Sequence, residues 1–145
     1  MESEYWRRIE EFWEEINIYD GAEVFLATYR SVPFEAGLLF AAQFCQSEVC
    51  NGGFKQFFFN STGVLAPEAV AGFRAIGQHQ TGEVVGGAMK LLGSPYPRDR
   101  ADRQARLVNL IATTFDVLDD RFYALIGTEA GGFEAASDAY AVKHK

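Results

Sequence analysis

The sequence predicts an all-α fold, a single compact multi-helix domain of about seven to nine helices over residues 1–145. Three observations predict it. Apolar residues recur at three- and four-residue steps, which is the helical period. Only 4 of the 145 residues are Pro, and the runs between Pro and Gly clusters are long enough for helices. No stretch alternates apolar with polar residues beside a β-hairpin dipeptide.

The first third of the chain contains three predicted helices. Residues 3–19 have the pattern of an amphipathic helix, with glutamates opposite an apolar stripe. The stripe consists of Tyr5, Ile9, Phe12, Ile16 and Tyr19. Asp20-Gly21 ends this helix, and residues 22–30 form a second one. Pro33 suits a helix start, so a third helix is expected over residues 34–50.

The third helix is expected to break at Asn51-Gly52-Gly53, because Asn and Gly tolerate the left-handed conformation that ends helices. Residues 54–60 restart as a short helix, and residues 61–63 form a turn. Further helices are predicted over residues 67–76, 83–92, about 103–118 and 133–142. Residues 119–126 either continue the long helix before them or kink away from it.

Asp99 or Asp102 is the expected cap of the helix that begins near Arg103. The i,i+4 pairs Asp99–Arg103 and Asp102–Arg106 support the start of that helix. Arg98 and Arg100 complete a group of four arginines. Because two of the four have a carboxylate at i−4, a solvated, internally paired helix start is favoured over a phosphate site.

Composition excludes several classes of function. The formal net charge of −7 disfavours direct binding to nucleic acid or to an anionic membrane. No segment approaches the roughly 20 apolar residues of a membrane span, and the first residues are charged, so a cytoplasmic protein is expected. Cys45 and Cys50 fit a reducing compartment, and a five-residue spacing on one helix keeps them apart.

Catalytic and metal-binding patterns are weak. His79 and His144 are the only histidines, and neither forms a ligand pattern with Cys45 or Cys50, so no metal or other cofactor is expected. Asp119 and Asp120 are adjacent, and neighbours on a helix point about 100° apart, so they make no catalytic couple unaided. The chain is therefore predicted not to be an enzyme.

Acidic residues concentrate at the two ends of the chain. Residues 1–48 carry a net charge of −7, residues 49–115 carry +3 and residues 116–145 carry −3. Glutamates three or four residues apart on a helix lie about 5–6 Å apart at Cβ, which makes a dense row of negative charge. The candidate acidic face consists of Glu4, Glu10, Glu11, Glu14, Glu15, Asp119 and Asp120.

Residues 48–63 form the most distinctive stretch. Its four Phe within six residues are too many for one helical face, so this segment is expected to be buried on several sides. Gln56 and Asn60 share a face, and Glu48 is placed to satisfy the N–H groups of Gly53 or Phe54. A buried, capped corner is the favoured interpretation. The alternative is a ligand notch lined by Glu48, Gln56 and Asn60.

These residues carry a family resemblance. The pattern that Glu48, Asn51, Gly52, Gly53, Phe54, Gln56, Phe57 and Asn60 form resembles the signature of the DNA mimic protein 19-like family. Residues 66–69, 74–77 and 118–123 are similar to the same family, so the resemblance covers about residues 30–126. It implies an all-helical fold. It also implies a homodimer whose acidic surface imitates DNA and occupies the DNA site of a basic, DNA-binding protein. The motif residues themselves look structural.

Three functions remain open from the sequence. The first is an acidic protein-binding module, with DNA mimicry as its sharpest form. The second is a helical interaction or immunity-type protein that uses a different surface. The third is a small-ligand binder or unrecognised enzyme that uses the corner between Glu48 and Asn60.

Overall fold

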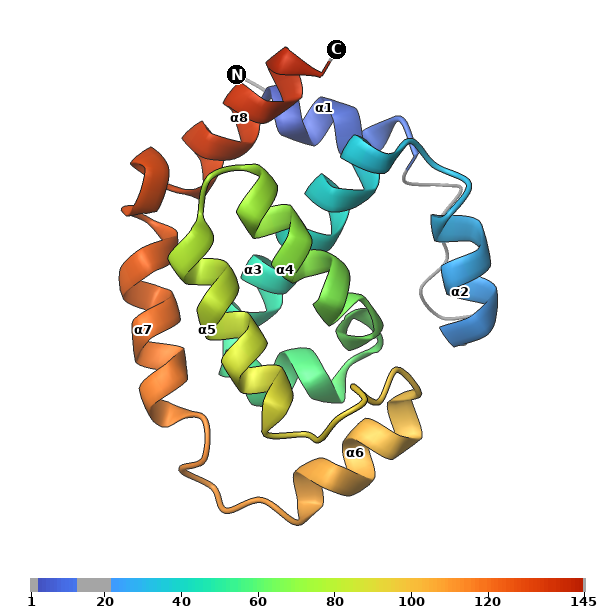
Figure 1. The fold of residues 1–145 in the computed structure, drawn as a ribbon, viewed down its shortest axis with the longest axis vertical. Coiled ribbons are helices and arrows are strands. Elements are labelled where there is room, and N and C mark those ends of the chain that lie inside the picture. Colours follow the sequence, from blue (N-terminus) through green and yellow to red (C-terminus); the bar gives the residue numbers. More distant parts are fainter. Residues whose placement is uncertain (1–2, 13–21, 145) are drawn as a thin grey trace.

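A computed structural model describes residues 3–12 and 22–144 of the chain. Within those residues it contains eight α-helices, two short 3₁₀ helices and no strand, which confirms the all-α prediction (Figure 1). The α-helices are α1 (Glu4–Glu10), α2 (Ala22–Tyr29), α3 (Phe34–Phe59), α4 (Ala66–Ala75), α5 (His79–Lys90), α6 (Arg100–Val108), α7 (Asp116–Ile126) and α8 (Phe133–Lys143). The 3₁₀ helices are η2 (Ser61–Leu65) and η3 (Glu129–Gly131).

Helix α3 is the centre of the fold. It packs against α1, α4, α6, α7 and α8, while α5 lies between α4 and α7. Figure 1 shows α1 and α8 together at one end of the molecule, α6 at the other end and α7 along one side. Residues from α3, α4, α7 and α8 therefore share one aromatic core, in which Phe54 lies edge-on to Phe122 and Phe73 edge-on to both Phe122 and Phe133.

The predicted break in the third helix is confirmed. Gly52 has φ −150° and ψ 19°, and Gly53 has φ 76° and ψ −179°, so neither is helical although the hydrogen-bonded turns run on through α3. A φ of 76° is strained for any residue with a side chain. The backbone therefore turns at Gly53, and the second half of α3 starts at Phe54, as the sequence indicates.

The predicted long helix over residues 103–118 is wrong. Helix α6 ends at Val108 and α7 begins at Asp116, with turns between them that include a Thr114 hydroxyl bond to the Ile111 carbonyl. Helix α6 crosses the end of α3, whereas α7 packs along α5 and α3, so one straight helix cannot serve both positions. Residues 119–126 belong to α7. Asp99 is the cap of α6, since its carboxylate accepts the Asp102 N–H at 3.1 Å.

Two other helix boundaries differ from the prediction. Helix α1 ends at Glu10, and the remainder of the predicted helix over residues 13–19 lies outside the described residues. Helix α5 begins at His79, one turn before the predicted start at residue 83, because a carboxylate from a distant segment stabilises its first turn. No helix in the described part of the chain is long and apolar enough to cross a lipid bilayer.

Candidate functional site

The motif residues form a closed polar cluster across the break in α3. One oxygen of Glu48, Oε2, accepts hydrogen bonds from Gln56 Nε2 at 2.7 Å and from Asn60 Nδ2 at 3.0 Å. Asn51 Nδ2 donates to Gln56 Oε1 at 3.3 Å. Glu48 and Asn60 therefore connect the two halves of the helix, and the polar atoms of the suggested notch are engaged with one another. This geometry supports the structural interpretation of the motif.

The N–H group at the restart of α3 is capped by Asp119, and the prediction that Glu48 caps it is wrong. Asp119 Oδ1 accepts the Phe54 N–H at 2.8 Å, and a methyl group on Gly53 would lie 2.6 Å from Asp119 Oδ2. Burial raises the pKa of Asp119, and the hydrogen bond from Phe54 opposes that rise. The glycine is thus required twice, by its positive φ and by the approach of this carboxylate.

The phenylalanines of the motif divide between the core and the surface. Phe54, Phe57 and Phe58 have no exposed side-chain surface, whereas Phe59 is 47% exposed. Tyr123 of α7 donates its hydroxyl to the Val49 carbonyl at 3.1 Å, just before the break. The Asn-Gly-Gly-Phe corner is therefore part of the α3–α7 interface, and most of its distinctive residues serve the fold.

The four arginines near α6 bind backbone carbonyls rather than the acids at i−4, so the predicted internal pairing is wrong, whereas Arg100 and Arg106 are exposed as predicted. Arg103 is fully buried, and it donates to Phe58 O at 2.8 Å, to Asn60 O at 2.8 Å and to Arg98 O. The last carbonyls of a helix have no partner within the helix, and they attract positive charge. Burial lowers the pKa of Arg103. Its guanidinium closes the C-terminal end of α3.

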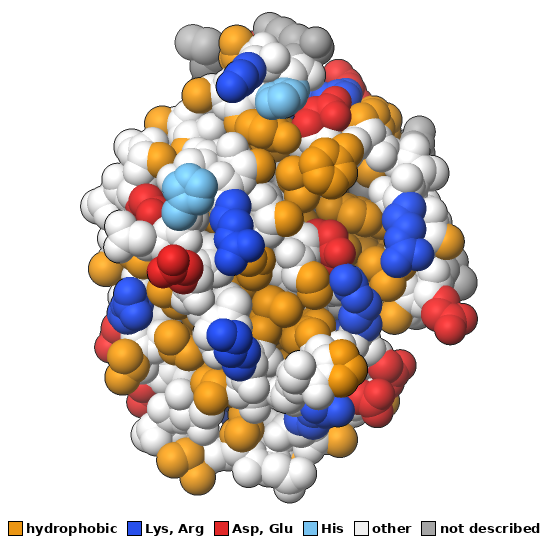
Figure 2. All heavy atoms as spheres, viewed as in Figure 1, with side chains coloured by type: hydrophobic (Ala, Val, Ile, Leu, Met, Phe, Trp, Pro, Cys, Tyr) orange, Lys and Arg blue, Asp and Glu red, His pale blue; other side chains and the backbone are white. Residues whose placement is uncertain are grey.

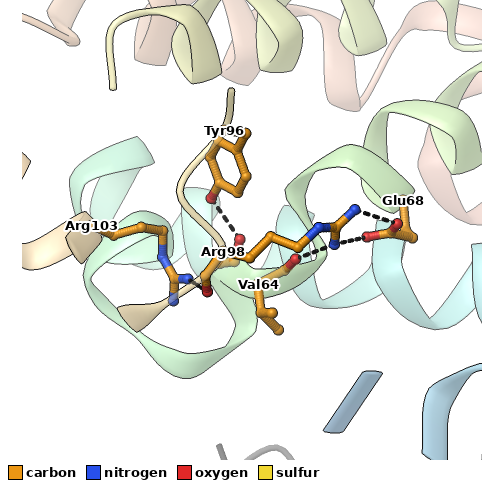
Figure 3. A network of polar contacts seen from close by, with 6 residues as sticks. Val64, Glu68, Tyr96, Arg98 and Arg103 are labelled. Carbon is orange, nitrogen blue, oxygen red and sulfur yellow. Dashed lines mark hydrogen bonds and ion pairs between the residues drawn. The ribbon is translucent and has the colours of Figure 1, made fainter. Parts of the chain in front are cut away.

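Figure 3 shows how the neighbouring contacts continue from Arg103. Arg98 extends from the loop before α6 to Glu68 of α4, with two N–H···O bonds of 2.7 and 2.9 Å, and it also donates to the Val64 carbonyl. Tyr96 donates its hydroxyl to Gly63 O at 2.6 Å. These contacts fasten residues 96–103 to η2 and α4.

The remaining two arginines act in the same way. Arg100 Nε donates to the Phe59 carbonyl at 3.0 Å, and Arg106 Nη1 donates to the Leu92 carbonyl at 2.6 Å, near the end of α5. These basic side chains satisfy the chain's own carbonyls. Their arrangement therefore follows from the fold without a phosphate ligand.

Two acid-bearing helices from opposite ends of the chain meet where α1 packs on α8. The Tyr5 N–H donates to Asp138 Oδ1 at 3.0 Å, and the Tyr5 ring lies edge-on to Phe133 at 5.5 Å. Burial raises the pKa of the Tyr5 hydroxyl, and the negative charges of Glu134 and Asp138 raise it further. We call the acidic side chains of these two helices, together with that of Glu11 at the C-cap of α1, the acidic end. They are Glu4, Glu10, Glu11, Glu134 and Asp138.

Arginines partly neutralise the acidic end. Arg7 lies 3.6 Å from Glu4 within α1, and Arg8 contacts both Glu11 and, at 2.6 Å, Glu35 of α3. The hydrogen bond from Arg8 lowers the pKa of Glu35. Two further predicted members of the acidic face, Glu14 and Glu15, lie outside the described residues.

The other predicted acidic residues lie apart from the acidic end. Asp119 and Asp120 are in the first turn and a half of α7, at the end of that helix remote from α8 (Figure 1). Asp120 is exposed, whereas Asp119 is directed to the corner of α3. On the face seen in Figure 2, basic and acidic side chains are interspersed without a continuous acidic band. The structure thus does not bring the two parts of the predicted face together.

The cysteines and histidines are not assembled into a site. Cys45 is buried and Cys50 is exposed. Burial raises the pKa of Cys45 well above its ordinary range, and it also raises the pKa of Cys50. Among residues 3–12 and 22–144, no three His, Cys, Asp or Glu side chains are grouped as metal ligands would be.

Two cavities touch different parts of α3. One, of about 260 Å³, lies between α2 and the start of α3, is mainly apolar and includes Glu68 in its wall. The other, of about 410 Å³, lies at the acidic end between α1, the turn after α7 and the first turn of α8. The exposed ring of Phe34 lies beside the first cavity, and Glu134 lines the second.

Together these features define a class: an acid-rich helical domain built around a broken central helix whose polar motif supports its own corner. The family follows from sequence comparison. The model of the family described as DMP19-like protein matches residues 30–144, and the chain belongs to that family. The match confirms the resemblance and extends it through α8, while α1 and α2 precede it. No curated protein and no solved structure matches the chain.

Proposed function

We propose that this chain is a protein-binding module that occupies the DNA-binding site of a basic protein, and that it acts by binding rather than by catalysis. The family takes its name from a DNA mimic, and membership supports this kind of partner. The contact surface in the proposal is the acidic end. Its complement is a groove that normally receives phosphates.

The observation that carries the proposal is the docking of α1 on α8. The Tyr5–Asp138 hydrogen bond and the Tyr5–Phe133 ring contact hold Tyr5, the residue after Glu4, against the helix that carries Glu134 and Asp138. Carboxylates one helical turn apart lie about 5–6 Å from one another at Cβ, a spacing on the scale of successive phosphates. The arginines Arg7 and Arg8 limit the net charge, so the proposed interaction is moderate in strength and sensitive to salt.

Capture in competition with DNA tests the proposal. The immobilised full chain is exposed to host-cell lysate at low salt, with and without added duplex DNA. We expect it to retain a DNA-binding protein that high salt or duplex DNA releases. Retained proteins that resist both would count against DNA mimicry, as would a chain that retains nothing above background.

Matched variants locate the surface. Glu4→Gln/Glu134→Gln removes two charges from the acidic end, and Asp116→Asn/Asp120→Asn removes two from the remote end of α7. We expect the first double variant to weaken capture about tenfold and the second to change it little, because side-chain charges act mainly within a Debye length of about 10 Å. The opposite ranking would move the contact surface to α7.

A second candidate is a helical interaction protein that uses a surface other than the acidic end. It is favoured by one observation, the 76% exposed ring of Phe34 beside the mainly apolar cavity under α2. Apolar contacts do not weaken with salt. Capture that persists in high salt and is lost in Phe34→Ser would support this candidate over mimicry.

A further inference from the structure

We propose that the cavity at the acidic end receives an arginine side chain of the basic partner. This inference rests on the proposed function and makes it specific. Surface charge alone attracts a basic protein at long range, whereas a cavity that accepts one guanidinium fixes the position of that protein.

The walls of the cavity suit a long, flat side chain. Its volume is about 410 Å³, and its lining includes the side chains of Tyr5, Gln46 and Phe133. Tyr5 is held in place by its ring contact with Phe133 and by the Tyr5 N–H bond to Asp138. An aromatic ring fixed in this way offers a surface on which a guanidinium can stack.

Glycines form much of the remaining wall. Gly127, Gly131 and Gly132 line the cavity, and the last two have φ 84° and 97° in the turn that leads into α8. A methyl group on Gly132 would lie 3.0 Å from the Gly127 carbonyl oxygen. The chain therefore reverses tightly here without side chains, which leaves backbone close to an incoming group.

The charge of the lining favours a cation. Glu134 is exposed and lines the cavity, no Lys or Arg does so among the described residues, and Asp138 accepts the N–H of Tyr5, which also lines it. Both carboxylates act on the Tyr5 hydroxyl, whose pKa is raised by burial and then by each of them. The first residues of α8 also line this region, and a helix N-terminus favours an anion, but Glu134 in the first turn of α8 opposes an anion directly.

Arginine fits these features better than lysine. A guanidinium can stack on an aromatic ring such as that of Tyr5 while its planar set of N–H groups donates to a carboxylate such as Glu134. An ammonium group is more strongly hydrated and has no flat face to stack. The expected occupant is therefore a single arginine that projects from a DNA-binding surface, where arginines are frequent.

Titration with a small probe tests the cavity without the partner. N-acetyl-arginine amide is added to the ¹⁵N-labelled full chain, and amide shifts are followed by NMR. We expect saturable shifts concentrated at residues 127–135, weaker binding in high salt, and none of these with N-acetyl-citrulline amide, which has the same shape without the charge. Nα-acetyl-lysine amide, which keeps its side-chain ammonium group, should bind more weakly than the arginine probe.

Two charge variants give the matched comparison. Glu134→Gln should weaken binding of the arginine probe about threefold, the effect of losing one exposed ion pair, while Asp120→Asn at the remote end of α7 should leave it unchanged. Shifts spread over the whole surface, equal binding of citrulline, or an unaffected Glu134→Gln variant would each overturn the inference. Probe binding without capture of a DNA-binding protein would instead refute the proposed function and leave the cavity assignment standing.

Discussion

The segment before the family match and the segment within it use carboxylates differently. Residues 1–29 contain eight acidic and two basic side chains, whereas residues 30–144 contain twelve and ten. Within the second segment, seven of the twelve carboxylates accept hydrogen bonds from the chain itself. They are Glu35, Glu48, Glu68, Asp99, Asp119, Glu129 and Asp138. The surplus negative charge of the protein thus lies mainly outside the matched segment.

This difference teaches that counting acids does not locate an acidic surface. Inside the matched segment carboxylates cap helices or join them, so their charge is balanced by N–H dipoles and guanidiniums. In the proposed function, the segment before the family match and the matched segment each contribute part of the binding surface. Helix α1 precedes the matched segment and α8 lies within it, and Asp138 accepts the hydrogen bond that joins them.

The largest expected effect tests the buried cation of the matched segment. Arg103→Ala removes the guanidinium donor from the carbonyls of Phe58, Asn60 and Arg98 and opens a void, so we expect the free energy of unfolding to fall by about 4 kcal/mol. Chemical denaturation measures it. Arg100→Ala, at an exposed position, is the control and should cost about 0.5 kcal/mol or less. Equal losses of unfolding free energy in the two variants would show that the Arg103 hydrogen bonds do not stabilise the end of α3.

The next effect tests the corner of α3. Gly53→Ala places a methyl group against the Asp119 carboxylate at a φ of 76°, and we expect a loss of about 2–3 kcal/mol. Gly86→Ala is the matched control, because a methyl group there meets nothing within 4 Å and helix propensity favours Ala. Thermal unfolding should therefore separate the two, with a lowered Tm for the first and a slightly raised Tm for the second. A tolerated Gly53→Ala would contradict the capping role of Asp119.

A third prediction concerns pH. Glu129 accepts N–H groups of Gln80 and Thr81 in the first turn of α5, and these bonds outweigh burial and lower its pKa. A carboxyl pKa that is lower in the folded state contributes stability above its ordinary pKa and loses it as the pH falls through the folded value. Glu129→Gln should cost about 1 kcal/mol at neutral pH.

Denaturation at two pH values checks the sign of this effect. The difference between wild type and Glu129→Gln should shrink as the pH falls below the ordinary glutamate pKa and through the lowered folded-state pKa, because the wild-type carboxylate then becomes protonated. Glu83 is exposed on the same helix, so Glu83→Gln should change the free energy of unfolding by about 0.5 kcal/mol or less at both pH values. A Glu129→Gln cost that is unaffected by acid would show that its charge is not what stabilises α5.

The smallest expected effect lies at the junction of the two segments. Arg8→Gln removes the contact with Glu35 and should destabilise the protein by about 0.5 kcal/mol, while hydrogen exchange of the α1 amides becomes faster. Arg7→Gln, whose partner Glu4 is on the same helix, is the comparison. If the α1 amides exchange at equal rates in the two variants, then Arg8 does not hold α1 against α3.

The local parts of this structure could be predicted from the sequence. Apolar periodicity indicates the helices, and the Gly pair marks the break in α3, because both signals act within a few residues. Between Arg103 and Leu118 the same apolar periodicity predicted one continuous helix, although the chain forms two. Exposed apolar residues such as Val108 and Ile111 continue a helical pattern, although the chain turns there.

The long-range contacts could not be predicted in this way. Asp119 reaches the Phe54 N–H across 65 residues, and Glu129 reaches Thr81 across 48. Their targets are backbone groups, which carry no residue-specific signal. Arg103 is similar, since its acceptors are three carbonyls and the nearby acids suggested an ion pair instead. The role of each charged residue therefore follows from topology.

Because Cys45 is buried and Cys50 is exposed, alkylation of the two thiols can report local or global unfolding of the protein. In the folded protein only Cys50 is accessible to an alkylating reagent, while Cys45 is enclosed and reacts only after the surrounding helices separate. Mass spectrometry would then count one adduct on intact molecules and two on molecules that have opened. The rate at which the second adduct accumulates would measure how often the core is breached under native conditions, without any engineered label.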